Sequence, residues 1–177
     1  MVTIRPASPP DAVACGAICY SAFCSINNAH GFPPDFPSPE ACVGLLTWLF
    51  SDPGHYAVVA EIDGRIAGSN CMDERSTIAG IGPITVDPTV QNRRVGRLLM
   101  DAVLDRSRQR RFSGVRLVQA AFHNRSLSLY SNLGFDAREP LSVMQGPAIR
   151  RQRQGIPPGQ LHRGSLCLLY TSDAADE

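Results

Sequence analysis

The chain has 177 residues, which is enough for one domain with a sizeable core. Hydrophobic residues make up 44% and charged residues 19%, and a formal net charge of +1 disfavours a nucleic acid or an anionic membrane as the partner. No stretch approaches the roughly 20 apolar residues of a membrane span, and the N-terminus lacks the apolar core of a signal peptide. We therefore expect a cytoplasmic protein without a membrane partner.

The six cysteines form no Cys-x-x-Cys pair, so we expect no metal site. Cys15 and Cys19 are four residues apart and would share one face of a helix, where we expect buried thiols. Cysteine chemistry is therefore not predicted to carry the function.

The sequence of the N-terminal third of the chain predicts a strand and two helices. Alternating apolar residues indicate a short strand within residues 2–8. The sequence Ser8-Pro9-Pro10-Asp11 is typical of a helix start, and apolar residues at helical spacing continue this helix to about residue 25. After an irregular loop, Ser38 is expected to cap a second helix that ends near residue 49.

The rest of the chain predicts mostly strands. Asp63-Gly64 suits the turn of a hairpin. The predicted elements are strands at 56–62, 65–74 and 78–86, a helix at 95–106, a strand at 114–122, a helix at 124–134 and a strand at 135–146. This order indicates a mixed sheet covered by helices, an α/β or α+β fold.

The C-terminal residues differ in character from the rest. Arg150 to Ser165 is rich in Arg, Gln, Gly and Pro and has no apolar periodicity, as is typical of a linker or a disordered segment. Cys167 to Glu177 resembles the translation of a transposase sequencing adapter in one reading frame. We expect a domain over residues 1–148 and a non-native or disordered tail over 149–177, with a natural basic tail as the alternative.

A basic loop, Gln91 to Arg97, is the first candidate site. A strand is predicted to end before it, at Val86, and a helix to begin near Val95, and the free N–H groups and dipole of a helix start favour phosphate. Gly96 would allow a ligand to approach closely, and three arginines, Arg93, Arg94 and Arg97, add charge. Taken alone, the loop could equally be a solvated helix start.

Two motifs together resemble the signatures of the GNAT-superfamily N-acetyltransferases. The first, a strand with V-x-P and then R/Q-x-x-G-x-G/A, is matched by Val86, Pro88, Gln91 and Gly96. The second, which begins with Asn and ends in L-Y-x-x-x-G-F, is matched by Asn124, Leu127, Leu129, Tyr130, Gly134 and Phe135. The resemblance covers residues 2 to 146 and implies a mostly antiparallel sheet of about six strands, splayed between the fourth and fifth and flanked by about four helices.

The resemblance also implies an activity and its partners. It implies transfer of the acetyl group of acetyl-CoA to a primary amine of a small molecule or peptide, by direct attack in a ternary complex without a metal. It places cofactor contacts at Ile84, Thr85, Val86, Gln91, Asn92, Arg93, Arg94, Val95, Gly96, Arg97 and Asn124. Tyr130 lies where the family often has a general acid.

The chemistry also requires a base, because the attacking amine must be neutral. Glu74, near the end of the third strand, is the first candidate. The residues leave three alternatives open: Asp73, Glu61 and Asp87. The backbone N–H of Val86 is the expected donor to the oxyanion that forms during transfer.

Arg94 departs from the family pattern, which usually has glycine at this position. If the backbone needs a positive φ there, arginine costs roughly 1 kcal/mol or more. We expect acetyl-CoA binding to be weakened but not abolished.

Two other functions stay open. A non-catalytic acyl-CoA sensor would share the fold and the cofactor contacts. A nucleic-acid-binding module would use a set of basic residues, Arg93, Arg94, Arg97, Arg106, Arg108, Arg110 and Arg111. These arginines lack interleaved aromatic residues, so this alternative is the weaker one. A homodimer is compatible with the sequence.

Overall fold

The computed structural model describes residues 1–142. The chain separates into Met1–Glu139 and Pro140–Glu177, and all the elements described below belong to the first unit. They are β1 (Val2–Pro6), η1 (Pro9–Asp11), α1 (Ala12–His30), α2 (Pro39–Ser51), β2 (His55–Ile62), β3 (Arg65–Asp73), β4 (Ile78–Val86), η2 (Pro88–Val90), α3 (Val95–Arg110), β5 (Gly114–Leu117) and α4 (Asn124–Ser131). The predicted domain boundary at residue 148 and the predicted tail over 149–177 lie outside the described residues.

The sheet has the order β1-β2-β3-β4-β5, and every neighbouring pair is antiparallel except the parallel pair β4 and β5. This confirms the predicted mixed, mostly antiparallel sheet with four α-helices. Within residues 1–142 the sheet has five strands, because residues 135–142 form no regular element. The remainder of the sixth predicted strand, 143–146, lies outside the described residues.

Local sequence signals account for most of the element ends. Ser38 caps α2 by accepting a hydrogen bond from the N–H of Ala41 at 3.3 Å. Asp63 and Gly64 have φ of 51° and 77°, as the tight turn between β2 and β3 requires. α1 runs to His30, beyond the predicted residue 25, and stops at Gly31, whose φ of 69° is the left-handed conformation of a helix C-cap.

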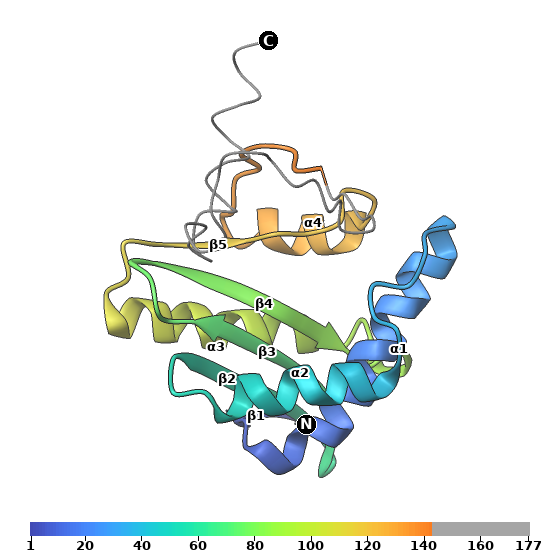
Figure 1. Ribbon diagram of the computed structural model, residues 1–177. Coiled ribbons are helices and arrows are strands. Elements are labelled where there is room, and N and C mark those ends of the chain that lie inside the picture. The colour runs from blue at the N-terminus through green and yellow to red at the C-terminus, as the bar shows by residue number, and fades with distance from the viewer. Residues whose placement is uncertain (143–177) are drawn as a thin grey trace, which may run out of the picture. The chain divides into compact units, whose positions relative to one another are not determined.

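Two helical layers enclose the sheet. α3 lies on one face, and α1 and α2 lie on the other (Figure 1). Because successive residues of a strand point to opposite faces, Val58 and Met72 pack toward α3, whereas Val59 and Cys71 pack toward α1 and α2. The strands are therefore buried on both sides, and each face presents its own set of side chains.

The cysteines near the α1 face are packing residues. Cys15 and Cys19 are fully buried, as predicted, together with Cys42 and Cys71. Burial raises the pKa of Cys15 to about 11 and that of Cys71 to about 12, so these thiols stay protonated and unreactive.

One expectation about α1 is wrong. By length and composition alone, Pro9–His30 is apolar enough to cross a membrane, with a mean hydropathy of 1.2, although we expected no such stretch. A core helix passes the same test, and the buried Ala12, Cys15 and Cys19 pack with residues of β2 and β3. The apolar character of this helix is thus used within the fold.

β4 and β5 separate partway along their length. They pair only from Ile78–Gly114 to Ile81–Leu117, whereas β4 stays paired with β3 as far as Val86. Gly82, with a φ of 138°, and Pro83, which has no N–H, follow the last pair. The predicted splay is confirmed. It also explains why β5 ends at Leu117, short of the predicted residue 122, since its partner strand has turned away.

Candidate active site

The splay gives the second half of β4 an open edge. Ile84, Thr85 and Val86 pair with Asn70, Ser69 and Gly68 of β3 on one side. On the other side, no strand of residues 1–142 pairs with them. The predicted cofactor contacts at Ile84, Thr85 and Val86 therefore coincide with backbone that can pair with the amides of a ligand.

The loop after β4 leads directly to the start of α3. Asp87 accepts hydrogen bonds from the N–H and the hydroxyl of Thr89, both at 2.8 Å, which begins η2. The N–H of Leu98 donates to the carbonyl of Arg94 at 3.0 Å, so this is the first helical bond. The N–H groups of Val95, Gly96 and Arg97 precede it and have no partner within α3. The loop thus has the donors of an anion site.

The backbone of this loop is left-handed at two non-glycine residues. Arg94, the N-cap of α3, has φ 62° and ψ 9°, and Asn92 has φ 73°. The expectation that position 94 needs a positive φ is confirmed. Arginine in this conformation costs about 1–2 kcal/mol relative to glycine. The strain therefore lies in the segment predicted to contact the cofactor.

Four arginines lie in or beside this loop, and they differ in whether they have a polar partner. Arg97 forms an exposed ion pair with Asp101 at 3.2 Å. Arg93 and Arg94 are exposed, and neither pairs with an acidic side chain of residues 1–142. Arg125, from α4, donates to Gln91 Oε1 at 2.7 Å and to the side-chain oxygen of Asn92. The sequence analysis missed Arg125, although it follows Asn124 in the second motif.

The two motifs come together around Gly96. A Cβ added to this glycine would lie 3.5 Å from Leu129 of α4 and 3.7 Å from Val86 at the end of β4. Residues that are more than thirty positions apart in sequence therefore lie against one another. The predicted cofactor contacts of β4, the loop and α4 belong to one region of the structure.

Tyr130 and Asn124 lie at opposite ends of α4. Tyr130 is buried in the cluster that includes α3, beside Phe135 at a ring distance of 6.0 Å. Burial raises the pKa of Tyr130, so its hydroxyl keeps its proton, as a general acid must. Asn124 is the exposed first residue of α4. His123 caps this helix by accepting from the N–H of Ser126 at 3.2 Å.

Glu74, the expected base, forms hydrogen bonds with an arginine of α3. Its carboxylate accepts two hydrogen bonds from Arg106 of α3, at 2.7 and 3.0 Å, and Arg110 lies 3.8 Å away. Only 8% of its side chain is exposed. The carboxylate thus faces α3 and is occupied by its arginines, away from the open edge of β4. The geometry thus argues against the base role that we expected for Glu74.

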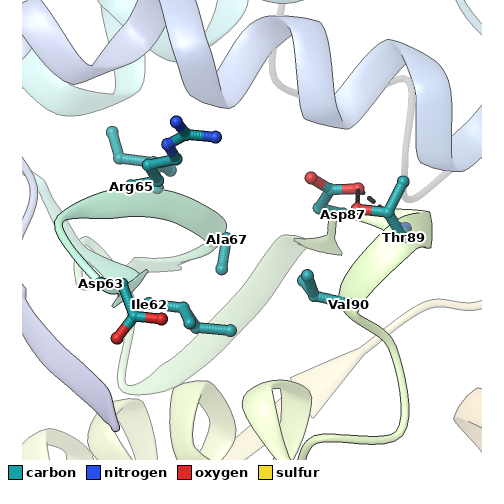
Figure 2. Close-up of a pocket in the computed structure, with 8 residues that line it drawn as sticks. Ile62, Asp63, Arg65, Ala67, Asp87, Thr89 and Val90 are labelled. Atoms are coloured by element: carbon teal, nitrogen blue, oxygen red, sulfur yellow. Dashed lines mark hydrogen bonds between the residues drawn. The ribbon is translucent and has the colours of Figure 1, made fainter.

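Two of the cavities in the described part of the chain contain candidate site residues. One, of about 470 Å³, lies between the β2–β3 turn and η2, and among the predicted site residues it contains only Asp87, an alternative base (Figure 2). The other, of about 500 Å³, lies where β4 and β5 separate. It is lined by Trp48, His55, Asp73, Arg75, Gly80, Ile81, Gly82, Pro83, Arg116, Leu117 and Val118. We call this second cavity the junction pocket.

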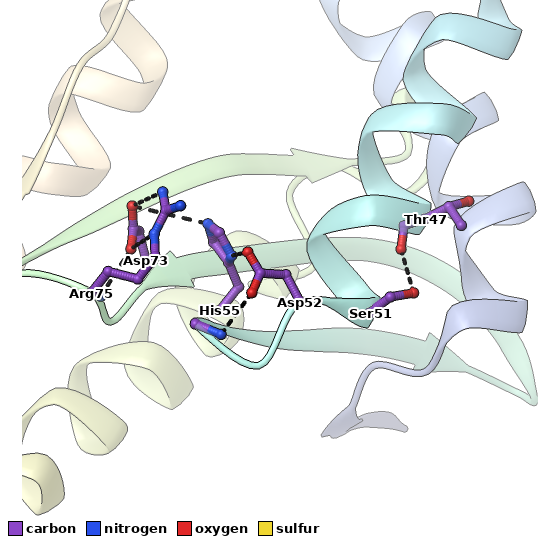
Figure 3. A network of polar contacts seen from close by, with 7 residues as sticks. Thr47, Ser51, Asp52, His55, Asp73 and Arg75 are labelled. Carbon is purple, nitrogen blue, oxygen red and sulfur yellow. Dashed lines mark hydrogen bonds and ion pairs between the residues drawn. The ribbon is translucent and has the colours of Figure 1, made fainter. Parts of the chain in front are cut away.

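A polar network forms one wall of the junction pocket. His55 lies between Asp52 and Asp73, and Arg75 pairs with Asp73 (Figure 3). The sequence analysis named Asp73 as an alternative base and did not name His55. Asp52 and His55 are three residues apart around a Pro-Gly turn, and this spacing is compatible with a contact between them. No known motif marks the pair as functional.

Known proteins with the same architecture were found by sequence profile and by structure. Residues 23–135, more than half of the chain, match the acetyltransferase (GNAT) family. No curated protein matches this sequence significantly. A mutant of the BH1408 protein from Bacillus halodurans aligns with a TM-score of 0.68 at 16% identity, covering 83% of this chain and 99% of that one.

Two further structures share the fold at similar identity. A ribosomal-protein-alanine N-acetyltransferase from Brucella melitensis biovar Abortus aligns with a TM-score of 0.60 at 18% identity, covering 82% of this chain and 100% of that one. AAC(6')-Iy in complex with a CoA bisubstrate analogue aligns with a TM-score of 0.65 at 15% identity, covering 84% and 99%. With the splayed sheet and both motifs in place, the family match shows that this chain belongs to the GNAT acetyltransferases.

Proposed function

We propose that this protein transfers the acetyl group of acetyl-CoA to a primary amine of a small molecule or peptide, in the cytoplasm, by direct attack in a ternary complex. The observation that carries the proposal is the open edge of β4 at Ile84–Val86, which runs into the free N–H groups at the start of α3. An elongated ligand with amides at one end and a pyrophosphate at the other fits this sequence of donors.

Each part of the site has a role in binding. The backbone of Ile84, Thr85 and Val86 pairs with the pantetheine amides. The loop amides from Gln91 to Arg97 hold the pyrophosphate, and the exposed Arg93 and Arg94 supply positive charge that no acidic side chain of residues 1–142 neutralises. Asn124 contacts the cofactor with its side chain.

The transfer step needs a donor for the oxyanion and an acid for the leaving group. The amine nitrogen forms a bond to the thioester carbon, and the oxygen takes the negative charge, which a backbone N–H of the open β4 edge stabilises. As the carbonyl forms again, the carbon–sulfur bond breaks and the sulfur leaves with the electron pair. Tyr130 donates its hydroxyl proton to the sulfur, and the amine loses its proton to a base.

The solved relatives differ in their acceptors. One is named for the alanine of a ribosomal protein, and another was solved with an analogue built on neamine. The junction pocket of this chain combines an exposed indole, Trp48, with charged side chains of both signs. This supports an acceptor with an apolar part next to its amine, in a small molecule or a peptide.

Release of free CoA tests the proposal. The full chain is incubated with acetyl-CoA and, separately, with spermidine, tyramine, lysine, glucosamine and a peptide with an N-terminal alanine. Thiol release is followed with a chromogenic reagent, and the acetylated amine is identified by mass spectrometry. We expect enzyme-dependent release with at least one amine.

The outcomes separate the alternatives. Acetyl-CoA binding by calorimetry without release of CoA, for this panel and for a wider amine library, would favour the acyl-CoA sensor over the enzyme. Absence of both binding and release would contradict the proposal altogether.

A further inference from the structure

We propose that His55, oriented by Asp52, is the base that accepts the proton of the incoming amine. This inference rests on the proposed acetyl transfer and adds a residue that neither family motif contains. It assigns the acceptor side of the reaction to the junction pocket.

Asp52 and the surrounding turn fix the orientation of the imidazole. Nδ1 of His55 lies 3.0 Å from Asp52 Oδ2, and the other oxygen of Asp52 accepts from the N–H of Gly54 at 2.9 Å. The Gly54 N–H and the nearby His55 lower the pKa of Asp52, which therefore stays ionised. An ionised carboxylate can only accept here, so the proton of a neutral imidazole belongs on Nδ1.

This assignment leaves the lone pair of Nε2 free. Nε2 is the nitrogen that faces Asp73, whose Oδ2 lies 4.0 Å away, and both side chains line the junction pocket (Figure 3). Only 4% of the His55 side chain is exposed, and the ring of Trp48 packs against it at 4.9 Å and 64°. The imidazole is therefore fixed in place with its basic nitrogen toward the pocket.

The pocket is where the acetyl group would arrive. Gly82 and Pro83 line it, and they immediately precede the open β4 edge proposed for the pantetheine. Leu117, the last paired residue of β5, lines it from the other side. A base in this pocket thus lies beside the start of the open β4 edge, whereas Glu74 is held by α3 on the opposite face of the sheet.

His55 has one competitor in the pocket. Among the side chains of residues 1–142 that line it, only His55 and Asp73 can accept a proton. Asp73 accepts from Arg75 at 2.8 and 2.6 Å, and this pairing lowers the pKa of Asp73 to about 2. A carboxylate so weakly basic does not remove a proton from an ammonium group, which leaves Nε2 of His55.

The proton then has a defined route. Nε2 takes one proton from the amine as its nitrogen bonds to the acetyl carbon, and the imidazole becomes an imidazolium. Asp52 and Asp73 stabilise the new positive charge, while Arg75 and Arg116, the cations of the pocket, oppose it. The imidazolium afterwards releases the proton to solvent, and Tyr130, which gave its proton to the sulfur, takes one back from solvent, so charge and protons balance over the cycle.

The test compares His55→Gln with the wild type, using the amine of the panel that reacts fastest. We expect kcat/KM to fall at least 100-fold, with acetyl-CoA affinity and melting temperature unchanged. The acid limb of the pH profile of kcat/KM should disappear in the variant. Asp52→Asn should lower kcat less, because it disturbs only the orientation of the ring. His30→Asn, an exposed histidine of α1 outside the pocket, is the matched control and should behave as the wild type.

Contrary results are distinguishable. If the wild type releases CoA and His55→Gln keeps both its rate within threefold and its acid limb, the inference is wrong and the proposed function stands. If the wild type releases none, the proposed function itself fails. Should His55→Gln not fold, the ¹⁵N shifts of the wild-type imidazole decide: a protonated Nδ1 with a free Nε2 supports the inference, and the opposite tautomer overturns it.

Discussion

The loop before α3 and the junction pocket lie at the two ends of the same open segment of β4, and they hold charge in opposite ways. In the loop, Arg93 and Arg94 are exposed without an acidic partner in residues 1–142. In the pocket, Asp73 pairs with Arg75 and His55 with Asp52. The loop suits a ligand that brings its own negative charge. The pocket pairs both of these carboxylates beforehand, with Arg116 outside the pairs, and suits the movement of one proton.

The largest expected effect is on acetyl-CoA binding by the loop before α3. Gly96→Glu places a carboxylate among the free N–H groups at the start of α3, and like-charge repulsion should weaken acetyl-CoA binding by about 100-fold or more. Gly96→Ala is the matched control for bulk, because its Cβ fits at 3.5 Å from Leu129, and we expect a smaller loss. Calorimetry measures both. Equal affinities for the two variants would remove the loop from the anion site.

The next effect tests whether Glu74 is structural. Glu74→Gln leaves the part-buried Arg106 without its anion and should lower the free energy of unfolding by about 2 kcal/mol, as measured in urea. Asp105→Asn breaks an exposed pair with Arg108 and should cost less than about 1 kcal/mol. If Glu74→Gln instead kept full stability and lost turnover about 100-fold, Glu74 rather than His55 would be the base.

A smaller gain is expected at Arg94. Arg94→Gly relieves a left-handed residue and should raise the free energy of unfolding by about 1 kcal/mol. It should also tighten acetyl-CoA binding, since the backbone can then lie closer to the pyrophosphate. Arg93→Gly removes the same charge at a residue without a positive φ, so it should not stabilise. An unchanged or weaker affinity of Arg94→Gly contradicts the idea that this arginine limits binding.

The smallest effect concerns the balanced charges of the pocket. The pKa of Asp73 is lowered from an ordinary 3.8 to about 2, so its pairing with Arg75 stabilises the fold above pH 3.8 and loses that contribution as the pH falls toward 2. Asp73→Asn should therefore show a weaker loss of stability over this interval. Parallel urea curves for the two proteins at every pH would show that the pair does not contribute.

The same comparison explains what the sequence could predict. The loop is a local motif, so Gln91, Gly96 and the strained position of Arg94 were recognisable from neighbouring residues alone. The junction pocket is assembled from α2, β2, β3, β4 and β5, and no short pattern describes it. Asp52 and His55 are close in sequence, but their contact gains meaning only once Gly82 and Leu117 complete the cavity.

Two features depended on contacts between elements that are distant in the sequence. Glu74 and Asp73 are adjacent, and successive side chains at the end of a strand point to opposite faces, so their roles depend on which face each one takes. The sequence did not reveal that Glu74 faces Arg106 on α3. Likewise, the apolar run after Leu117 indicated a longer strand, and only the divergence of β4 removed its partner.

Mapping acetyl-CoA on the ¹⁵N-labelled full chain by amide NMR tests the central claim most directly. The account predicts that saturating acetyl-CoA shifts the amides of Ile84–Val86 and Gln91–Arg97, with smaller changes at Arg125. Shifts confined to the cavity of Figure 2, or none at saturation, would contradict it.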